Sequence, residues 1–158
     1  EGARVVVNGR TAANVEETVK LIKSAKGEAI GAAGDVSEHG VAERIVRAAV
    51  DRWGAVDVLV NNAAIAGPVA PLGKEDIGEW WKTQQINILG PFLMTRSATA
   101  AMRKKPLTPG GAPRGKVIDV SSGAGRGFAG DLVPYRVSKA GLLRLSTALA
   151  AHLQPEGI

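Results

Sequence analysis

Apolar, β-branched runs alternate along this chain with segments in which apolar residues recur at helical spacing. This alternation is typical of an α/β fold, in which helices connect the strands of a parallel sheet. The runs that we expect to form strands are residues 3–8, 28–35, 56–60 and 116–120. The third run, VDVLV, has the character of a strand that is buried on both faces of the sheet.

Helical segments lie between and after these runs. The apolar stripes of the first two are Val15, Val19 and Ile22, and Val41, Ile45 and Ala49. We expect the first helix to end at Gly27 and Ser37 to cap the second. A long helix is predicted from Ile77 to Met102, and a last helix from Tyr135 to Leu153, after a Pro- and Gly-rich surface loop at 106–115.

In an open parallel sheet, ligands bind in the crevice at the carboxyl ends of the strands. The residues that directly follow the predicted strands are small or polar: Gly9 and Arg10, Asp35 and Val36, Asn61 to Ala64, and Ser121 and Ser122. The chemistry of the protein is therefore expected at this edge of the sheet.

Length and composition fit a single globular domain over residues 1–158, of which 45% are apolar. The chain has no cysteine and only two isolated histidines, His39 and His152, so we expect neither disulfides nor a metal site. A reducing compartment, the cytoplasm, fits best. No apolar run reaches the ~18 residues that a membrane-spanning helix needs, so we expect no membrane partner.

The net charge of +5 raises the possibility of nucleic-acid binding. However, the basic residues are spread along the chain, and only residues 103–105 form a local run. Aromatic residues are few, with three Trp, two Phe and one Tyr, and they do not interleave with basic ones. The composition predicts no nucleic-acid partner and favours anionic small molecules.

The segment YRVSK places Tyr135 and Lys139 four residues apart at the start of the last helix. Residues at this spacing share a helix face, so both side chains can reach one crevice. An ammonium group beside a phenol favours the phenolate and makes the tyrosine a usable general acid or base. Alone, such a pair is more often a tyrosine at a helix start and a solvated surface lysine.

Ser122 follows the fourth predicted strand, 13 residues before Tyr135. Its hydroxyl could bond the same substrate oxygen as the phenol. Since side chains alternate along a strand, Ser121 and Ser122 should face opposite ways if the strand geometry persists there, and only one should be catalytic. Alone, SSG is also a common turn composition.

Taken together, these segments resemble the short-chain dehydrogenase/reductase family over essentially the whole chain. The matching stretches are DV at 35–36, NNAA at 61–64, Asn87 within QINILGPF, DVSSGAG at 119–125 and YRVSKAG at 135–141. Within the family, the pattern looks most like 3-oxoacyl-carrier-protein reductases and sugar-alcohol dehydrogenases. The resemblance implies a Rossmann-like, doubly wound parallel sheet in three α/β/α layers.

The resemblance also implies roles for individual residues. Hydride would move between a nicotinamide and the carbon of a ketone or secondary alcohol. Tyr135 would exchange a proton with the substrate oxygen, and Lys139 would favour its phenolate. Ser122 would orient that oxygen, and Asn87 would hold a water that links Lys139 to solvent. Asn61 would tie neighbouring strands together. The implied cofactor-binding residues are Arg10, Asp35, Val36, Asn62, Ala63, Tyr135 and Lys139.

The end of the first predicted strand favours NADP(H) over NAD(H). An acidic residue there usually binds the ribose 2′-hydroxyl of NAD, whereas an arginine accommodates the 2′-phosphate of NADP. This chain has Gly9 and Arg10, so no carboxylate repels a phosphate and a guanidinium can bind it bidentately. Arg10 could also be a surface residue that begins a loop.

One segment only looks like a cofactor-binding motif, and two features depart from the family. GAGRGF at 123–128 looks like a dinucleotide loop, but Phe128 stands where the motif requires glycine, so we expect it to shape the substrate entrance. Ala64 stands at a usual glycine position and costs about 1 kcal/mol if positive φ is needed there. The family's first strand, Gly-rich pyrophosphate loop and last strands are missing between Glu1 and Ile158. We expect a partial NAD(P)-binding domain that is weakly active or inactive alone.

Other functions remain possible on this fold. The main alternative is a non-catalytic nucleotide-sensing or interaction protein, and another is a hydrolase that uses the same serine and lysine. Through the family, the long helix and the last helix are expected to pair in a homodimer or homotetramer. Small residues compatible with close helix contact, or with packing on the sheet, are Ala98, Ala101, Ala148 and Ala151.

Overall fold

The computed structural model describes residues 2–107, 110–127 and 131–158. In this part of the chain, strands and helices alternate as the sequence predicted. The strands are β1 (Arg4–Val7), β2 (Glu28–Gly31), β3 (Val58–Asn61) and β4 (Lys116–Asp119). The α-helices are α1 (Ala12–Ser24), α2 (Val41–Trp53), α3 (Ile77–Gln84), α4 (Gly90–Met102) and α5 (Val133–Leu153). Three short helices complete the list: η1 (Gln85–Leu89), η2 (Gly123–Gly125) and η3 (Gln154–Glu156).

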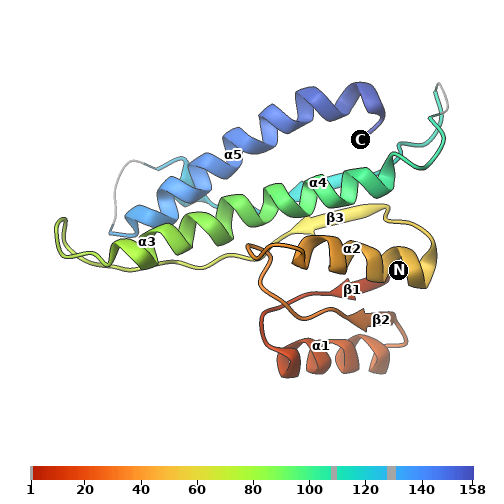
Figure 1. The fold of residues 1–158 in the computed structure, drawn as a ribbon, viewed down its shortest axis with the longest axis horizontal. Coiled ribbons are helices and arrows are strands. Elements are labelled where there is room, and N and C mark those ends of the chain that lie inside the picture. The colour runs from red at the N-terminus through yellow and green to blue at the C-terminus, as the bar shows by residue number, and fades with distance from the viewer. Residues whose placement is uncertain (1, 108–109, 128–130) are drawn as a thin grey trace.

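The strands form two parallel pairs. β1 pairs with β2, so that Arg4 lies opposite Glu28, and β3 pairs with β4, so that Val58 lies opposite Lys116. Helices cover both faces of the first pair, with α1 on one side and α2 on the other (Figure 1). This layered arrangement confirms the expected Rossmann-like α/β class.

The core lies between α2, α4 and the strands. Its buried members include Val36, Ile45, Leu59, Met94 and Met102. Ala98, on α4, is fully buried among them, so its small side chain serves the core. Ala148 and Ala151 on α5 are exposed.

β3 differs from the expectation of a strand buried on both faces, and that prediction is wrong. Leu59 is 9% exposed, whereas Val58 and Val60 on either side of it are 51% and 54% exposed. The reason is the alternation of side chains along a strand. Leu59 belongs to the core that includes α4, while no described element buries the opposite face.

A groove of about 620 Å³ separates β1 from β3. The two strands belong to separate sheets, so they are not hydrogen-bonded to each other. Apolar residues from both strands, α2 and α4 line the groove, among them Val6, Val60, Ile45 and Met94. These open strand edges agree with the expectation of a sheet that lacks one of its strands.

The start of α2 also differs from the prediction. Ser37 does not cap this helix, because the helix begins at Val41 after Gly40, which has a φ of 79°. The backbone N–H and hydroxyl of Ser37 instead donate to Asp35 Oδ1, at 2.9 and 2.6 Å. Ser37 therefore stabilises the turn after β2, and a glycine in the left-handed region provides the helix start.

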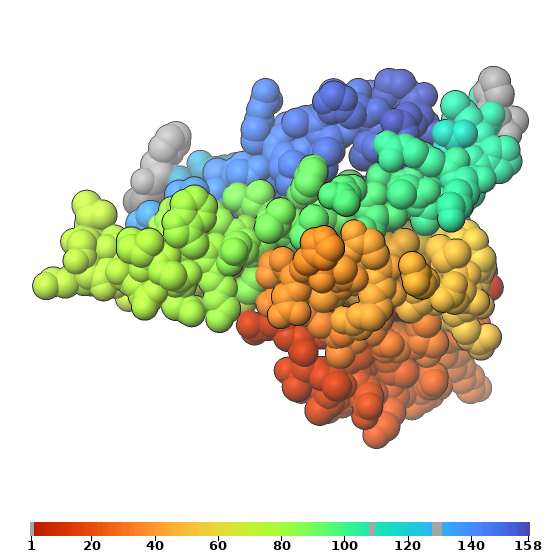
Figure 2. Space-filling view, viewed as in Figure 1, coloured from red at the N-terminus to blue at the C-terminus, as the bar shows by residue number. Residues whose placement is uncertain are grey.

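The long helix runs from Ile77 to Met102 as predicted, but it is not uniform. Asp76 caps it by accepting from the Glu79 N–H at 2.9 Å. In its middle, η1 is a π-helical turn. Such turns are uncommon and often occur at functional sites. In the space-filling view, the α3 end projects sideways from the rest of the molecule (Figure 2).

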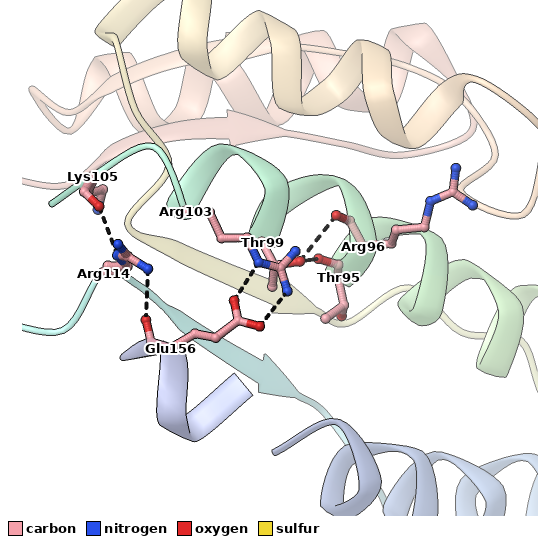
Figure 3. A network of polar contacts seen from close by, with 7 residues as sticks. All are labelled: Thr95, Arg96, Thr99, Arg103, Lys105, Arg114 and Glu156. Carbon is pink, nitrogen blue, oxygen red and sulfur yellow. Dashed lines mark hydrogen bonds and ion pairs between the residues drawn. The ribbon is translucent and has the colours of Figure 1, made fainter. Parts of the chain in front are cut away.

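A polar clasp joins the end of α4 to η3 (Figure 3). Arg103 donates two hydrogen bonds to the Glu156 carboxylate, at 2.5 and 3.0 Å. Arg114 donates to the backbone oxygens of Lys105 and Glu156, at 2.8 and 3.4 Å. The clasp holds the C-terminal end of α5 beside that of α4.

Among residues 2–107, 110–127 and 131–158, no helix has both the length and the apolar character needed to cross a bilayer. The same residues contain no cluster of potential metal ligands.

Candidate functional site

The carboxyl ends of β1, β2 and β3 meet at one small cavity, as expected for parallel strands. The cavity has a volume of about 200 Å³. Its lining comes from the three strand ends and from η1: Asn8, Gly9, Arg10, Gly34, Asp35, Val36, Ala63, Ala64, Ile65 and Ile86. Four predicted cofactor residues, Arg10, Asp35, Val36 and Ala63, therefore share one site.

Asn8, which the sequence motifs did not indicate, fixes the geometry of this cavity. Its side-chain amide donates to the backbone oxygens of Ala32 and Gly34, at 2.8 and 3.1 Å. These bonds tie the end of β1 to the segment that leads to Asp35. A polar residue at the last position of an apolar run was the signal available in the sequence.

The candidate cofactor residues differ in exposure and in position. Arg10 is exposed, Asp35 is half-buried, and Val36 is buried against Gly90, where an added Cβ would lie 2.6 Å from Val36 Cγ2. Asn62 is exposed and lines the groove between β1 and β3 rather than the smaller cavity.

The expected strain at Ala64 is absent. Lys26 is the only non-glycine residue with positive φ in the described part of the chain. Ala64 therefore needs no glycine-like conformation here, and the cost foreseen for it does not arise.

Asn61 ties strands together, as the resemblance implied. Its buried amide donates to Asp119 Oδ1 on β4 at 2.8 Å and to Thr95 Oγ1 on α4 at 3.1 Å. This residue therefore fixes the ends of β3 and β4, from which the loop with Asn62 and the segment with Ser122 depart.

Tyr135 and Lys139 lie close together at the start of α5. The Lys139 side chain passes the phenol, with Nζ 5.7 Å from the centre of the Tyr135 ring. Lys139 is only 3% exposed, and its Nζ donates to the Val120 backbone oxygen at 2.7 Å. The alternative of a solvated surface lysine is therefore wrong.

Burial lowers the pKa of Lys139, because desolvation disfavours the charged ammonium. The carboxylate of Asp119 opposes this effect and raises the pKa. A lysine on α5 whose ammonium is buried against the residue that follows β4, in spite of its desolvation cost, is typical of a functional position.

Ser122 stands at the junction between β4 and η2. Its hydroxyl oxygen accepts from the Ala124 N–H at 3.2 Å and so caps the short helix. Ser121 differs, because its buried hydroxyl has no hydrogen-bond partner among the described residues. The two hydroxyls thus differ in their hydrogen bonding. Because β4 ends at Asp119, the expected alternation of the two side chains stays a prediction.

The segment after Ser122 packs tightly on α5. A Cβ at Gly125 would lie 2.8 and 2.9 Å from the carbonyl carbon and oxygen of Lys139. Only glycine permits this approach, which holds the Ser122 segment against the turn that carries Lys139. Gly123–Gly125 forms a 3₁₀ turn that packs on α5. Phe128, which was predicted to break the dinucleotide motif, lies outside the described residues.

Asn87 lies in the π turn and is fully buried. Its carboxamide oxygen accepts from the Ile65 N–H at 2.9 Å, and its amide donates to the Ile65 oxygen at 2.8 Å. The second amide hydrogen goes to Ser138 Oγ at 2.9 Å. The side chain therefore joins the loop after β3 to α5, a connection that the sequence did not predict.

Comparison with known proteins identifies the family. A family model described as short chain dehydrogenase matches residues 1–158, which is the whole chain. The chain belongs to this family. An uncharacterized oxidoreductase of Thermotoga maritima is 40% identical over 159 residues, covering 99% of this chain and 59% of that protein.

Solved structures of short-chain dehydrogenases and reductases superpose well on this member of the family. A 3-ketoacyl-ACP reductase from Sinorhizobium meliloti matches with a TM-score of 0.87 and 31% identity, over 99% of this chain and 60% of that one. A gluconate 5-dehydrogenase from Burkholderia cenocepacia, solved with NADP and tartrate, matches with a TM-score of 0.84 and 26% identity, over 99% and 58%. The chain thus spans about three fifths of the length of these proteins.

Proposed function

We propose that the protein containing this chain transfers hydride between NADP(H) and a ketone or secondary alcohol. Membership of the short-chain dehydrogenase family supports an oxidoreductase. The observation that carries the finer proposal is the buried Lys139, whose Nζ lies beside the Tyr135 ring and bonds the end of β4 next to Ser122. The 3-ketoacyl-ACP reductase and gluconate 5-dehydrogenase named above act on carbonyl or alcohol carbons, which supports this substrate class.

In this proposal, each side chain has a separate role in the transfer of the proton. Tyr135 gives a proton to the carbonyl oxygen in reduction, or takes it from the alcohol in oxidation. Lys139, whose Nζ lies 5.7 Å from the centre of the Tyr135 ring, would contribute a positive charge beside the group that exchanges the proton. Ser122 orients the substrate oxygen by a hydrogen bond from its hydroxyl. Asn87 holds the site together through its contacts with Ile65 and Ser138.

The residues around the small cavity fit the adenosine part of a dinucleotide. Gly9, Gly34, Ala63 and Ala64 leave it open because they have little or no side chain. The cofactor, when bound, would supply or accept the hydride. Asp35 and Val36 would contact its adenine, Asn62 and Ala63 its ribose and nicotinamide side, and Tyr135 and Lys139 the nicotinamide ribose.

Arg10 supports a preference for NADP(H). Its exposed guanidinium stands at the cavity, and Gly9 before it carries no carboxylate. A bidentate bond from arginine to the 2′-phosphate would favour NADP(H), whereas NAD(H) offers only a hydroxyl there.

Exchange of this arginine tests the cofactor proposal. In Arg10→Glu, we expect the KM for NADPH to rise roughly ten- to hundredfold, since a charged hydrogen bond contributes about 1.5–3 kcal/mol. The KM for NADH should change little. Arg144→Glu, an exposed exchange of the same charge on α5, serves as the control. Equal effects of Arg10→Glu on both cofactors would contradict the preference.

We also propose that copies of the protein associate through α4 and α5 into a homodimer or homotetramer. Exposed apolar residues support this. Leu89 at the end of η1, Phe92 on α4, and Val133 and Val137 on α5 are 38–52% exposed. Ala148 and Ala151 are available at the surface of α5, whereas Ala98 is committed to the core.

A further inference from the structure

Ser138 is a buried polar residue to which the proposed proton chemistry gives no role. It lies within YRVSK, between Tyr135 and Lys139, and is 0% exposed. Its hydroxyl oxygen accepts from Asn87 Nδ2 at 2.9 Å, and the hydroxyl donates to the Tyr135 backbone oxygen at 2.7 Å. Ser138 therefore contacts both the π turn and the helical turn that carries the proposed general acid.

The contacts continue from Asn87 to the wall of the small cavity. Asn87 holds the backbone of Ile65 by both its N–H and its carbonyl oxygen. Ile65 in turn lines the 200 Å³ cavity in which the adenosine part of the cofactor is proposed to bind. A continuous path of hydrogen bonds, here called the Ser138 link, thus runs from Ile65 through Asn87 and Ser138 to Tyr135.

A second hydroxyl on α5 shows what is particular about Ser138. Thr147 makes the same type of bond, from its hydroxyl to the Arg144 backbone oxygen three residues earlier, at 2.9 Å. That bond is exposed, as is usual for a local feature of a helix surface. The bond from Asn87 is what distinguishes Ser138.

Burial makes this bond hard to replace. Both Asn87 and Ser138 are 0% exposed, so water has no access to an amide hydrogen that loses its partner. Removing the Ser138 hydroxyl would leave this hydrogen unsatisfied, and the carboxamide would have to turn to find another acceptor. Any such turn disturbs its two bonds to Ile65.

We propose that Ser138 is a positioning residue that sets the place of Tyr135 relative to the cofactor cavity. It does not touch the substrate and acts through Asn87 and the Tyr135 backbone. This inference rests on the proposed function, because it concerns the alignment of the general acid with the bound cofactor. Small misalignments of reacting groups reduce turnover while leaving binding intact.

The test compares Ser138→Ala with Thr147→Ala, which removes the same kind of hydroxyl from the same helix. In the intact protein, Ser138→Ala should lower kcat about tenfold or more, with the KM for NADPH within about twofold of the wild type. The Ile65 amide should exchange with solvent about tenfold faster, measured by NMR against the Val120 amide of the β3–β4 ladder. Thr147→Ala should change neither kcat nor the exchange rate of the Ile65 amide.

A double variant separates positioning from mere stability. In an Asn87→Ala background, residue 87 has no side-chain amide to donate a hydrogen bond to Ser138. Ser138→Ala should therefore have little additional effect on kcat. Wild-type kcat in Ser138→Ala, or a full additional loss in the Asn87→Ala background, would overturn the proposal. If the wild type transfers no hydride at all, the proposed function fails instead. In that case, the hydrogen exchange of the Ile65 amide alone tests the Ser138 link. An unchanged exchange rate in Ser138→Ala would refute it.

Discussion

At the scale of single residues, Lys139 combines burial with a charge. Its side chain is 3% exposed and its pKa is lowered by desolvation, although Asp119 opposes the shift. A group of this kind stabilises the fold less than an apolar side chain of similar length. Its burial on α5 against the Val120 oxygen agrees with a role in the proposed reaction, because active-site groups are often held at a cost in stability.

Lys139→Met should separate the cost of Lys139 to stability from its contribution to the proposed reaction. The variant should lose turnover, yet its melting temperature at pH 7 should exceed that of the wild type by a few degrees. Because folding lowers the pKa of Lys139, the unfolded chain binds more protons, and the stability of the wild type rises with pH. The difference in melting temperature should therefore narrow as the pH rises toward ~10, the ordinary value for lysine.

Lys20→Met, at an exposed position on α1, is the control for removing a positive charge. Thermal denaturation followed by circular dichroism from neutral to alkaline pH measures both variants. A lower melting temperature of Lys139→Met at pH 7, with a difference that does not depend on pH, would contradict this account of Lys139.

At the scale of elements, the clasp between α4 and η3 makes a separate prediction. The hydrogen bond from Arg103 lowers the pKa of Glu156, so the clasp stabilises the fold while this carboxylate is ionised. Its contribution is present above the ordinary pKa of glutamate, about 4.3, and is lost as the pH falls through the lowered value. The pair is solvent-exposed, so the effect should be small.

Glu156→Gln should therefore lower the melting temperature slightly at pH 7 and leave it unchanged in strong acid, where the wild-type carboxylate is also neutral. Glu17→Gln, at an exposed position on α1, should match the wild type throughout. An equally large decrease in the melting temperature of Glu156→Gln at pH 7 and in strong acid would show that the ionised carboxylate does not stabilise the fold through the clasp.

The positions of the elements could be predicted from the sequence, whereas their contacts could not. Apolar periodicity located the strands and helices because it reflects local geometry. It did not show that Val58 and Val60 are exposed, since that depends on what covers each face. It also missed the Ser138 link, because Asn87 lies 22 residues from Ile65 and 51 from Ser138 along the chain.

At the scale of the whole molecule, the two halves of the site lie on different parts of an interrupted sheet. The proposed cofactor-binding residues Arg10 and Asp35 follow β1 and β2. The proposed catalytic residues are Ser122, which follows β4, and Tyr135 and Lys139 on α5. The groove between β1 and β3 separates the two strand pairs. Motifs predicted the members of each half, and the resemblance to a family was needed to join them into one site.

The proposed reaction depends on the exchange of a proton between Tyr135 and the substrate. Its most direct test is Tyr135→Phe in the protein that contains this chain, assayed for NADPH-dependent reduction of a panel of ketones and for NADPH binding by calorimetry. Tyr135 is the only tyrosine in the chain, so no second phenol can substitute for it within these residues.

We predict that Tyr135→Phe loses a factor of about 10²–10⁴ in turnover, because the proton transfer is lost, while the Kd for NADPH stays within about threefold of the wild type. A non-catalytic sensor on the same fold would show no such turnover in either form. Wild-type turnover in Tyr135→Phe would contradict the account.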